Sequence, residues 1–287
     1  MNYSKIEKKV QEDISVKFYL HASVFTHVGC KRPNNEDNFL LNQTYNVDSV
    51  LEMSETISIT NPILKWHCAG VFDGMGGGEN GELASRMASE EFQKIAEEMN
   101  TETLESDIDN MMRQAFLNAN RRIVEEQLFH AMYGTTGTVV CTNGKNFKVF
   151  HLGDSRAYLW REETLYQITQ DQTLAQLKIS AGFYEADDPL VEKEKHQLTE
   201  YIGRDMTMEH LAPLESEWLE LLPNDKILLC SDGLYDMCSD TEINDIIKKN
   251  NSIEEITKQL VTLALEHGGI DNITCLLLEI EKNIKKI

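Results

Sequence analysis

The sequence contains few prolines, few basic residues and no long apolar segment. Only five prolines occur among 287 residues, and no stretch is rich in glycine and serine, so no interdomain linker is indicated. No apolar segment approaches the roughly 20 residues that span a bilayer, and the N-terminus is charged where a signal peptide would be apolar. We therefore expect one domain, a cytoplasmic location and no association with a membrane.

The shortage of basic residues leaves the chain strongly acidic. It has 27 Lys and Arg against 48 Asp and Glu, which gives a formal net charge of −21. Nucleic acids and anionic lipids would repel such a protein, so we expect neither as a partner. A solvated acidic surface accounts for most of this charge, and a cluster of carboxylates accounts for only a few units.

The cysteine pattern lacks the spacings that carry zinc or redox chemistry. None of the six cysteines forms a C-x-x-C pair, which argues against zinc ribbons and thioredoxin-like sites. None has an arginine six positions later, so the thiolate and phosphate-binding arginine loop of a cysteine-based phosphatase is missing as well. We expect core thiols in a reducing compartment. The cysteines are Cys30, Cys68, Cys141, Cys230, Cys238 and Cys275.

Apolar periodicity predicts two central helices and many short strands. Apolar residues recur at helical spacing over residues 83–99 and 108–124, and their methionines are best explained as core residues. Consecutive short strands without a helix between them indicate antiparallel sheets, whose outer faces the helices must cover. We therefore expect an α+β fold, a four-layer αββα sandwich of two antiparallel β-sheets flanked by α-helices. The strand-like segments are 15–28, 38–41, 66–72, 135–141, 147–152, 156–160, 165–168, 226–230 and 272–279.

The other segments complete the expected organisation. Residues 1–15 form an N-terminal extension, a short helix or frayed tail, and residues 16–287 form one domain. Residues 42–62 are polar and aperiodic, so we expect a long excursion between two strands. A mostly helical or irregular section covers residues 173–213, and further helices begin near Asp240 and Ser252.

Acidic residues stand at the ends of four apolar segments that are far apart in the sequence. One apolar segment ends at Asp73, and the glycines that follow allow the sharp turn that presents its carboxylate. The others are Glu36-Asp37, Asp232 and Asp271. An aspartate before a glycine is a common turn signal on its own. Their joint occurrence at strand ends predicts that they converge on one site.

Such a carboxylate cluster is too costly to leave unpaired, so it implies bound cations. Oxygen ligands select Mg²⁺ or Mn²⁺, and the Gly74 carbonyl could add another oxygen. Two such ions about 4 Å apart lower the pKa of a bridging water and orient it for in-line attack on phosphorus. Arg32, four residues before Glu36, is suited to bind phosphate oxygens.

Six segments, in order along the chain, resemble the signature of the metal-dependent protein phosphatase family of the phosphatase 2C type, and the bacterial branch most closely. The resemblance covers residues 23–279. The segments are Arg32-Pro33-Asn34-Asn35-Glu36-Asp37, Phe72-Asp73-Gly74-Met75-Gly76-Gly77, Gly134-Thr135-Thr136, Leu152-Gly153-Asp154-Ser155-Arg156, Ser231-Asp232-Gly233 and Gly268-Gly269-Ile270-Asp271-Asn272-Ile273-Thr274.

The resemblance implies a protein serine/threonine phosphatase that hydrolyses phosphoserine and phosphothreonine with a metal-bridging hydroxide. It also implies phosphorylated protein substrates, a cognate Ser/Thr kinase acting on the same proteins, and a variable flap at residues 175–198 that helps to choose substrates. Glu36 would act behind the ligands or through water, Arg32 would bind the phosphate, and Asp154 and Asp236 would form a weaker third metal site with Asp232. The implied ligands of the two Mn²⁺ or Mg²⁺ ions are Asp37, Asp73, Asp232, Asp271 and the carbonyl of Gly74.

Three positions depart from the family pattern. Met75 follows Asp-Gly where some relatives carry a histidine that could act as a general acid. Gly78 stands where bacterial members often have histidine, and Gln172 follows Asp171 where histidine is usual. The metal ligands are intact, so these changes affect the tuning of the site.

Two alternatives belong to other functional classes. A non-catalytic, phosphoprotein-binding regulatory member of the same fold would be expected to have lost metal ligands, and none is missing here. A nucleotide-binding enzyme is suggested by residues 76–81, which formally match G-x-G-x-x-G. The dinucleotide fold requires a parallel strand and an acidic residue after the next helix, whereas this sequence predicts a second helix there.

Overall fold

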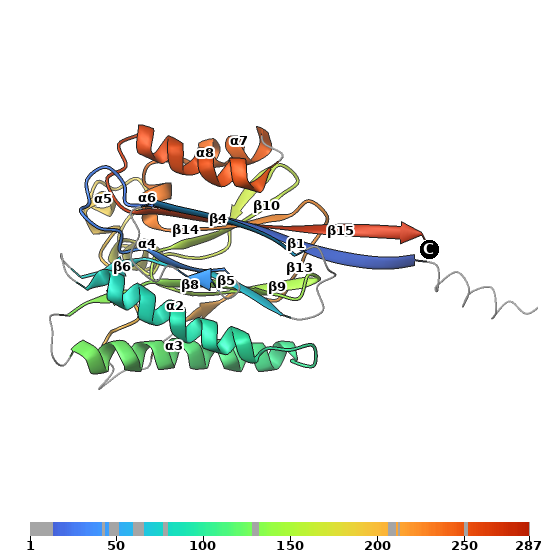
Figure 1. The fold of residues 1–287 in the computed structure, drawn as a ribbon. Coiled ribbons are helices and arrows are strands. Elements are labelled where there is room, and N and C mark those ends of the chain that lie inside the picture. The colour runs from blue at the N-terminus through green and yellow to red at the C-terminus, as the bar shows by residue number, and fades with distance from the viewer. Residues whose placement is uncertain are drawn as a thin grey trace, which may run out of the picture.

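The computed structural model describes residues 14–41, 44–45, 52–59, 66–76, 80–127, 132–205, 211, 213–249 and 252–286. The described elements form four layers, with helices on the outside and two β-sheets in the middle (Figure 1). This arrangement confirms the αββα sandwich expected from the sequence.

One layer is a six-stranded antiparallel sheet, which we call sheet A. At its centre, β1 and β15 pair from Ile14 opposite Lys286 to His27 opposite Ile273. The strand order is β11 (Thr164–Gln167), β10 (Arg156–Arg161), β14 (Lys226–Cys230), β15 (Ile273–Lys286), β1 (Ile14–His27) and β4 (Glu52–Ile59).

The second layer, sheet B, is also antiparallel. The predicted hairpin at Asn143-Gly144 joins two of its strands, β8 and β9. The strand order is β12 (Leu214–Glu215), β9 (Asn146–Leu152), β8 (Gly137–Thr142), β5 (His67–Phe72), β2 (Asn38–Leu41) and β3 (Thr44–Tyr45), and β13 (Leu219–Glu220) also pairs with β9. A separate two-stranded ribbon joins β6 (Gly74–Met75) to β7 (Gly134–Thr135).

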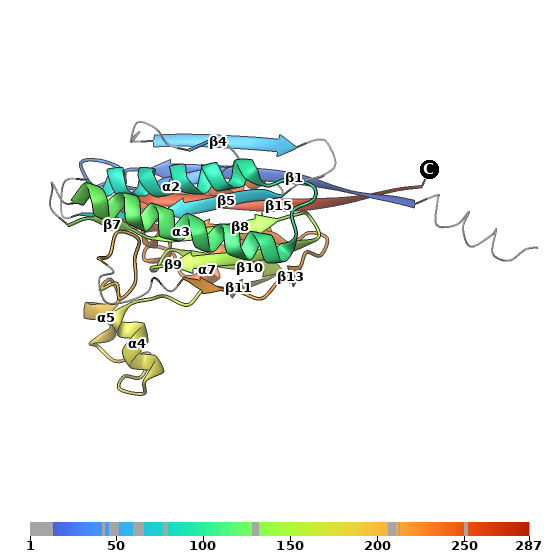
Figure 2. The same cartoon turned by 90° about the horizontal axis from the view of Figure 1, so that it is seen from below.

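Four helices cover the outer faces of the two sheets. Helices α2 (Gly81–Glu98) and α3 (Glu105–Gln127) lie on sheet B, while α7 (Asp240–Lys249) and α8 (Ile253–Glu266) lie on sheet A (Figure 1). The short helices α4 (Leu174–Ser180) and α5 (Val191–Glu194) project from one end of the sandwich (Figure 2), and α6 (Asp232–Tyr235) follows β14. Within the described residues, no helix is both long enough and apolar enough to cross a bilayer.

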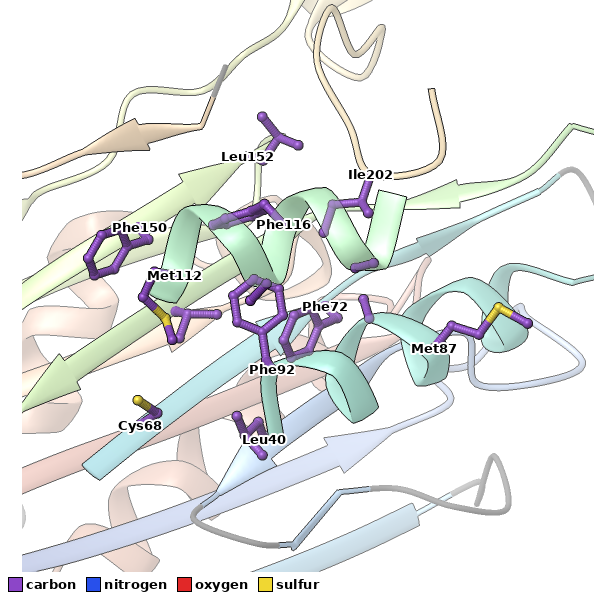
Figure 3. Packing of buried hydrophobic residues seen from close by; sticks show 14 of the residues in the cluster. Leu40, Cys68, Phe72, Met87, Phe92, Met112, Phe116, Phe150, Leu152 and Ile202 are labelled. Carbon is purple, nitrogen blue, oxygen red and sulfur yellow. The ribbon is translucent and has the colours of Figure 1, made fainter. Parts of the chain in front are cut away.

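Apolar side chains fill all three spaces between the layers. In the layer under α2 and α3, the ring of Phe92 packs against Phe72 at 5.3 Å and against Phe116 at 4.8 Å between ring centroids (Figure 3). Met87 and Met112 belong to the same cluster, which confirms that the helical methionines are core residues. Phe72 closes this core one residue before Asp73, so packing holds the backbone that carries the carboxylate.

The expected excursion at residues 42–62 is wrong in part, because strand β4 occupies Glu52–Ile59 and pairs with β1. Its sequence alternates apolar residues such as Ile57 and Ile59 with polar ones. That alternation is weak alone, and the open edge of β1 supplies the hydrogen-bond partners that make it a strand. Most of the expected N-terminal extension, residues 1–13, lies outside the described residues, and β1 begins at Ile14.

The nucleotide-binding alternative does not fit this topology. Helix α2 leads into α3, and β5 pairs in antiparallel fashion with both of its neighbours, β2 and β8. A dinucleotide-binding unit needs a parallel strand at that point. Gly78 and the rest of residues 77–79 lie outside the described residues.

The hairpin between β10 and β11 gives a first testable prediction. Glu162 and Glu163 form its two-residue turn with positive φ angles of 51° and 62°, which Asn-Gly adopts at lower cost. Replacing both residues with Asn-Gly is expected to raise the free energy of unfolding by about 1 kcal/mol, measured by urea denaturation. The change also removes the exposed ion pair between Glu163 and Lys248, so Lys248→Ala serves as the control. A destabilised double variant would contradict the prediction.

Candidate metal centre

Neighbouring strands of sheet B bring two of the predicted acids together. Asp37 directly precedes β2, and Asp73 directly follows β5. Because β2 and β5 are antiparallel, with Asn38 opposite Phe72, the start of one strand and the end of the other lie at the same end of the sheet. The two carboxylates therefore leave the sheet side by side.

Sheet A repeats this arrangement with the other pair. Asp232 lies two residues after β14, and Asp271 lies two residues before β15, while Cys230 pairs with Cys275 in the antiparallel ladder. Asp154 sits in the connection from β9 in sheet B to β10 in sheet A. The stacked sheets thus place five acids at one end of the sandwich.

The predicted residues line one cavity of about 610 Å³. Asp37 is the exception, since it lies beneath the cavity with 2% of its surface exposed. The predicted residues on the cavity wall are Arg32, Glu36, Asp73, Gly74, Asp154, Asp232, Asp236 and Asp271.

Asp37 is held from one side and open on the other. The hydroxyl groups of Ser231 and Thr274 both donate hydrogen bonds to Asp37 Oδ2, each at 2.7 Å. Its other oxygen, Oδ1, is buried and has no hydrogen-bond partner among the described residues. Burial raises the pKa of Asp37 to about 7, although the two hydroxyl groups favour the charged form.

Asp73 is fixed through its backbone. Its amide donates to the Thr136 hydroxyl at 2.9 Å, and its carbonyl accepts from the Thr136 amide at 2.8 Å and the Thr135 hydroxyl at 2.9 Å. Burial raises the pKa of its carboxyl group well above the usual value, and the charges of Asp37 and Asp232 raise it further. Its side chain is thus presented into a region of excess negative charge.

Asp154 and Asp232 extend this negative region. Burial and the nearby Asp232 raise the pKa of Asp154 well above the usual value. One oxygen of Asp232, Oδ1, is buried without a hydrogen-bond partner in the described part of the chain. Hard divalent cations bind to negatively charged oxygen ligands. Buried carboxylate oxygens that receive no hydrogen bond, in a group of acids that repel one another, are therefore suited to bind such cations. The residues present therefore fit Mg²⁺ or Mn²⁺.

Gly74 allows the loop after β5 to approach the loop that carries Glu36. A Cβ atom on Gly74 would lie 2.5 Å from the Glu36 carbonyl oxygen and 2.3 Å from that of Gly81, so only glycine fits. The Gly74 amide donates to the Glu36 carbonyl at 3.2 Å. Burial raises the pKa of the Glu36 carboxyl group, and nearby Glu82 raises it further.

Asn272 ties the loop that carries Asp271 to the segment between β1 and β2. Its side-chain amide donates to the carbonyl oxygens of Val28 and Asn34, both at 2.9 Å, and its Oδ1 accepts from the Glu36 amide at 2.8 Å. The sequence motif contained Asn272, but its role was missed because the partners are more than 200 residues away along the chain.

Arg32 lies at the mouth of the cavity and pairs with a predicted metal ligand. Its Nη2 donates to Asp271 Oδ2 at 2.5 Å, and half of its side-chain surface is exposed. The remaining guanidinium donors therefore lie at the entrance, next to the acids.

Two basic residues of the flap, which the sequence did not single out, reach the predicted third site. His196 approaches Asp232 through Nδ1 at 3.3 Å and Asp236 through Nε2 at 3.1 Å, while the Lys195 ammonium lies 3.1 Å from Asp236. The two hydrogen bonds raise the pKa of His196 to about 10. Asp154, His196 and Asp232 can offer ligand atoms that lie within 4.8 Å of one another. Nothing in the local sequence marks His196, since the fold alone brings the flap here.

Gln172 joins the residue that follows the flap to the loop that carries Asp154. Its Oε1 accepts from the Gly153 amide at 2.8 Å, and its own amide donates to the Gly153 carbonyl at 2.7 Å. Its carbonyl accepts from both the amide and the hydroxyl of Thr199, just after the flap. Glutamine at this position therefore has a positioning role in the loop.

A family model described as "Protein phosphatase 2C" matches residues 42–178 and 218–273 of the chain. Among curated proteins, the chain is 30% identical over 263 residues to "Serine/threonine phosphatase stp" of Listeria welshimeri, with 91% of this chain and 96% of that protein covered. It is 29% identical over 273 residues to "Protein phosphatase PhpP" of Streptococcus pneumoniae, with 92% and 98% covered.

Solved structures of serine/threonine phosphatases are also similar to this chain. The serine/threonine phosphatase of S. agalactiae superposes with a TM-score of 0.76 at 25% identity, over 91% of this chain and 99% of that one. The catalytic domain of the phosphatase PstP, solved in complex with two manganese ions, superposes with a TM-score of 0.71 at 25% identity, over 92% and 99% of the two chains.

Proposed function

The chain belongs to the protein phosphatase 2C family, and we propose that its converging aspartates hold the two Mn²⁺ or Mg²⁺ ions with which it hydrolyses phosphoserine and phosphothreonine in proteins. The single observation that carries this assignment is the pair of buried oxygens, Asp37 Oδ1 and Asp232 Oδ1, that lack hydrogen-bond donors among the described residues. The proposed ligands are Asp37, Asp73, Asp232, Asp271 and the carbonyl of Gly74.

When bound, the ions activate water and offset the charge that develops on the phosphoryl group. The protein orients the ligands for this role. Hydrogen bonds from Ser231 and Thr274 occupy one oxygen of Asp37, and its other oxygen has no hydrogen-bond donor among the described residues, so it can bind an ion. The threonine contacts to the Asp73 backbone fix the second ligand. We propose that Glu36, held by Asn272, supports the centre from behind or through water.

A weaker third site is proposed at Asp154, Asp232 and Asp236. The support is the burial of Asp154 and its electrostatic interaction with Asp232. His196 lies against the same acids, so the flap would adjoin an ion held there.

Arg32 is proposed to bind the phosphate. Its guanidinium can fork onto two phosphate oxygens, and ions on Asp271 would release it from its present ion pair. Arg32→Ala is expected to lower kcat/KM for a phosphopeptide roughly 30-fold, mostly through KM, and Arg32→Lys should fall between the variant and the wild type. Steady-state kinetics measures this. Mn²⁺ affinity from calorimetry is the control and should not fall, because Arg32 competes with the ions for Asp271, whereas an unchanged KM in Arg32→Ala would contradict the role.

The activity is tested directly on the purified protein. Release of phosphate from a phosphothreonine peptide should require Mn²⁺ or Mg²⁺ and stop in EDTA. Turnover that continues unchanged in EDTA would overturn the mechanism. The non-catalytic alternative would need the absence of divalent-ion binding, and the intact set of acids gives it no support.

We further propose a cytoplasmic location, a cognate Ser/Thr kinase and a single domain over residues 16–287. The six cysteines are free thiols and five of them are buried, which supports a reducing compartment. The pairing of the first and last strands in the centre of sheet A supports one folding unit. Dephosphorylation of candidate phosphoproteins from the source cell tests the kinase partnership.

A further inference from the structure

Ile270 is an exposed apolar residue in a cavity that is lined largely by charged and polar residues. It directly precedes the proposed ligand Asp271, lines the same cavity, and has 57% of its surface exposed. The other apolar residues on the wall, Met75, Leu198 and Met237, are each only partly exposed. Exposure of a branched aliphatic side chain to water is unfavourable, so covering it with an apolar ligand group would be favourable.

The turn that carries Ile270 is held rigidly. Gly268 and Gly269 have positive φ angles of 124° and 48°, and their amides close the end of α8 on Leu265 and Ala264. The Gly269 carbonyl accepts from the Cys30 amide at 2.7 Å. The exposure of Ile270 is therefore imposed by the backbone.

Met237 lies beside this turn and provides a second apolar surface. The His267 ring donates through Nδ1 to the Met237 carbonyl at 2.7 Å, which ties the end of α6 to the turn. Met237 also packs on the core under α7 and α8 while it lines the cavity. We call Met237 and Ile270 together the apolar shelf.

We propose that the apolar shelf binds an apolar side chain directly next to the phosphorylated residue of the substrate. This inference rests on the proposed function, which places the phosphate beside Asp271. Consecutive Cα atoms are about 3.8 Å apart across a trans peptide, so the side chain of a residue next to the phosphorylated one can reach Ile270, the neighbour of Asp271. Scattered surface hydrophobics are normal, but this one continues the catalytic cavity. The preferred substrates are phosphopeptides with leucine, isoleucine, methionine or an aromatic residue at that place.

Matched phosphothreonine peptides test the shelf. One set has leucine directly before or directly after phosphothreonine, and the other has alanine at those positions. With Mn²⁺, the wild-type protein should show a kcat/KM roughly fivefold to tenfold higher for one of the leucine peptides than for its matched alanine peptide. An enclosed pocket would give a larger ratio, because the shelf is open on one side. In Ile270→Ser this ratio should fall to about one.

The ratio of kcat/KM for the leucine peptide to that for the alanine peptide distinguishes loss of the shelf from a general loss of catalysis, since a general loss lowers both values equally. Leu104→Ser is the matched control, because Leu104 is 64% exposed and lies outside the cavity, and it should keep the wild-type ratio. Thermal melting shows that each variant is folded. A wild-type ratio near one for both leucine positions, or a ratio that survives in Ile270→Ser, would overturn the inference. If neither peptide is hydrolysed in Mn²⁺, the proposed function itself fails and the inference falls with it.

Discussion

Replacing Asp73 with asparagine is expected to lower the Mn²⁺-dependent kcat on the order of 10³-fold. The substitution keeps the shape of the side chain and its backbone contacts to Thr135 and Thr136, so it removes mainly the charge that the ions need. Steady-state assays across a Mn²⁺ titration, together with calorimetry, measure both the rate and the loss of ion affinity.

The same variant should be more stable than the wild type when both are free of metal. Asp73 is half-buried near Asp37 and Asp232, and removing its charge relieves their mutual repulsion. Thermal melting in EDTA tests this opposite effect. Asp245→Asn, an exposed change on α7, is the matched control and should alter neither property. Full activity in Asp73→Asn would rule out the proposed ligand set.

Removing the metal is expected to abolish activity and to make the stability of the protein depend on pH. The pKa of Asp37 is about 7 in the folded protein, against an ordinary value of 3.8 for an aspartate in an unfolded chain. A raised pKa means that the folded state binds the proton more tightly, so stability is lost as pH rises from 3.8 towards 7. Between about pH 5 and pH 7 this one group should remove about 2 kcal/mol from the free energy of unfolding.

Urea denaturation in EDTA at about pH 5 and pH 7, compared with Asp37→Asn, isolates this effect. The comparison is needed because burial lowers the pKa of His151 to about 4, which stabilises the protein as pH rises through the same range. The variant shares His151, so the difference between the two proteins reports Asp37. With saturating Mn²⁺ the order of stability should reverse, and the wild type should be more stable than Asp37→Asn, since the ions bind the charged carboxylate. Identical pH dependence of both proteins in EDTA would refute the assignment.

The convergence of the acids could be anticipated from the sequence because short-range signals carry it. An apolar segment such as residues 66–72 predicts a strand, and an aspartate at its end must leave the sheet there. In an antiparallel sandwich the strand ends lie at only a few places, so Asp73 and Asp232 could occupy only a few positions in the fold. The helices over residues 83–99 and 108–124 followed from their periodicity in the same way.

What the sequence could not reveal depends on contacts between distant segments. Strand β4 exists because β1 offers an open edge, and no local pattern shows that edge. His196 and Lys195 reach Asp232 and Asp236 only because the flap folds back over the end of the sandwich. The clamp formed by Asn272 likewise joins the last strand to a loop near the start of the chain.

The central position of β15 in sheet A sets the order in which the enzyme matures during synthesis. Strands β1 and β14 both hydrogen-bond to β15 and not to each other, so a nascent chain that ends before residue 273 holds two unjoined halves of the sheet. Asp271 lies two residues before that strand. Synthesis of the last strand is therefore expected to complete the scaffold and the proposed ion-binding site almost together, so a nascent chain that lacks this strand is expected to be inactive.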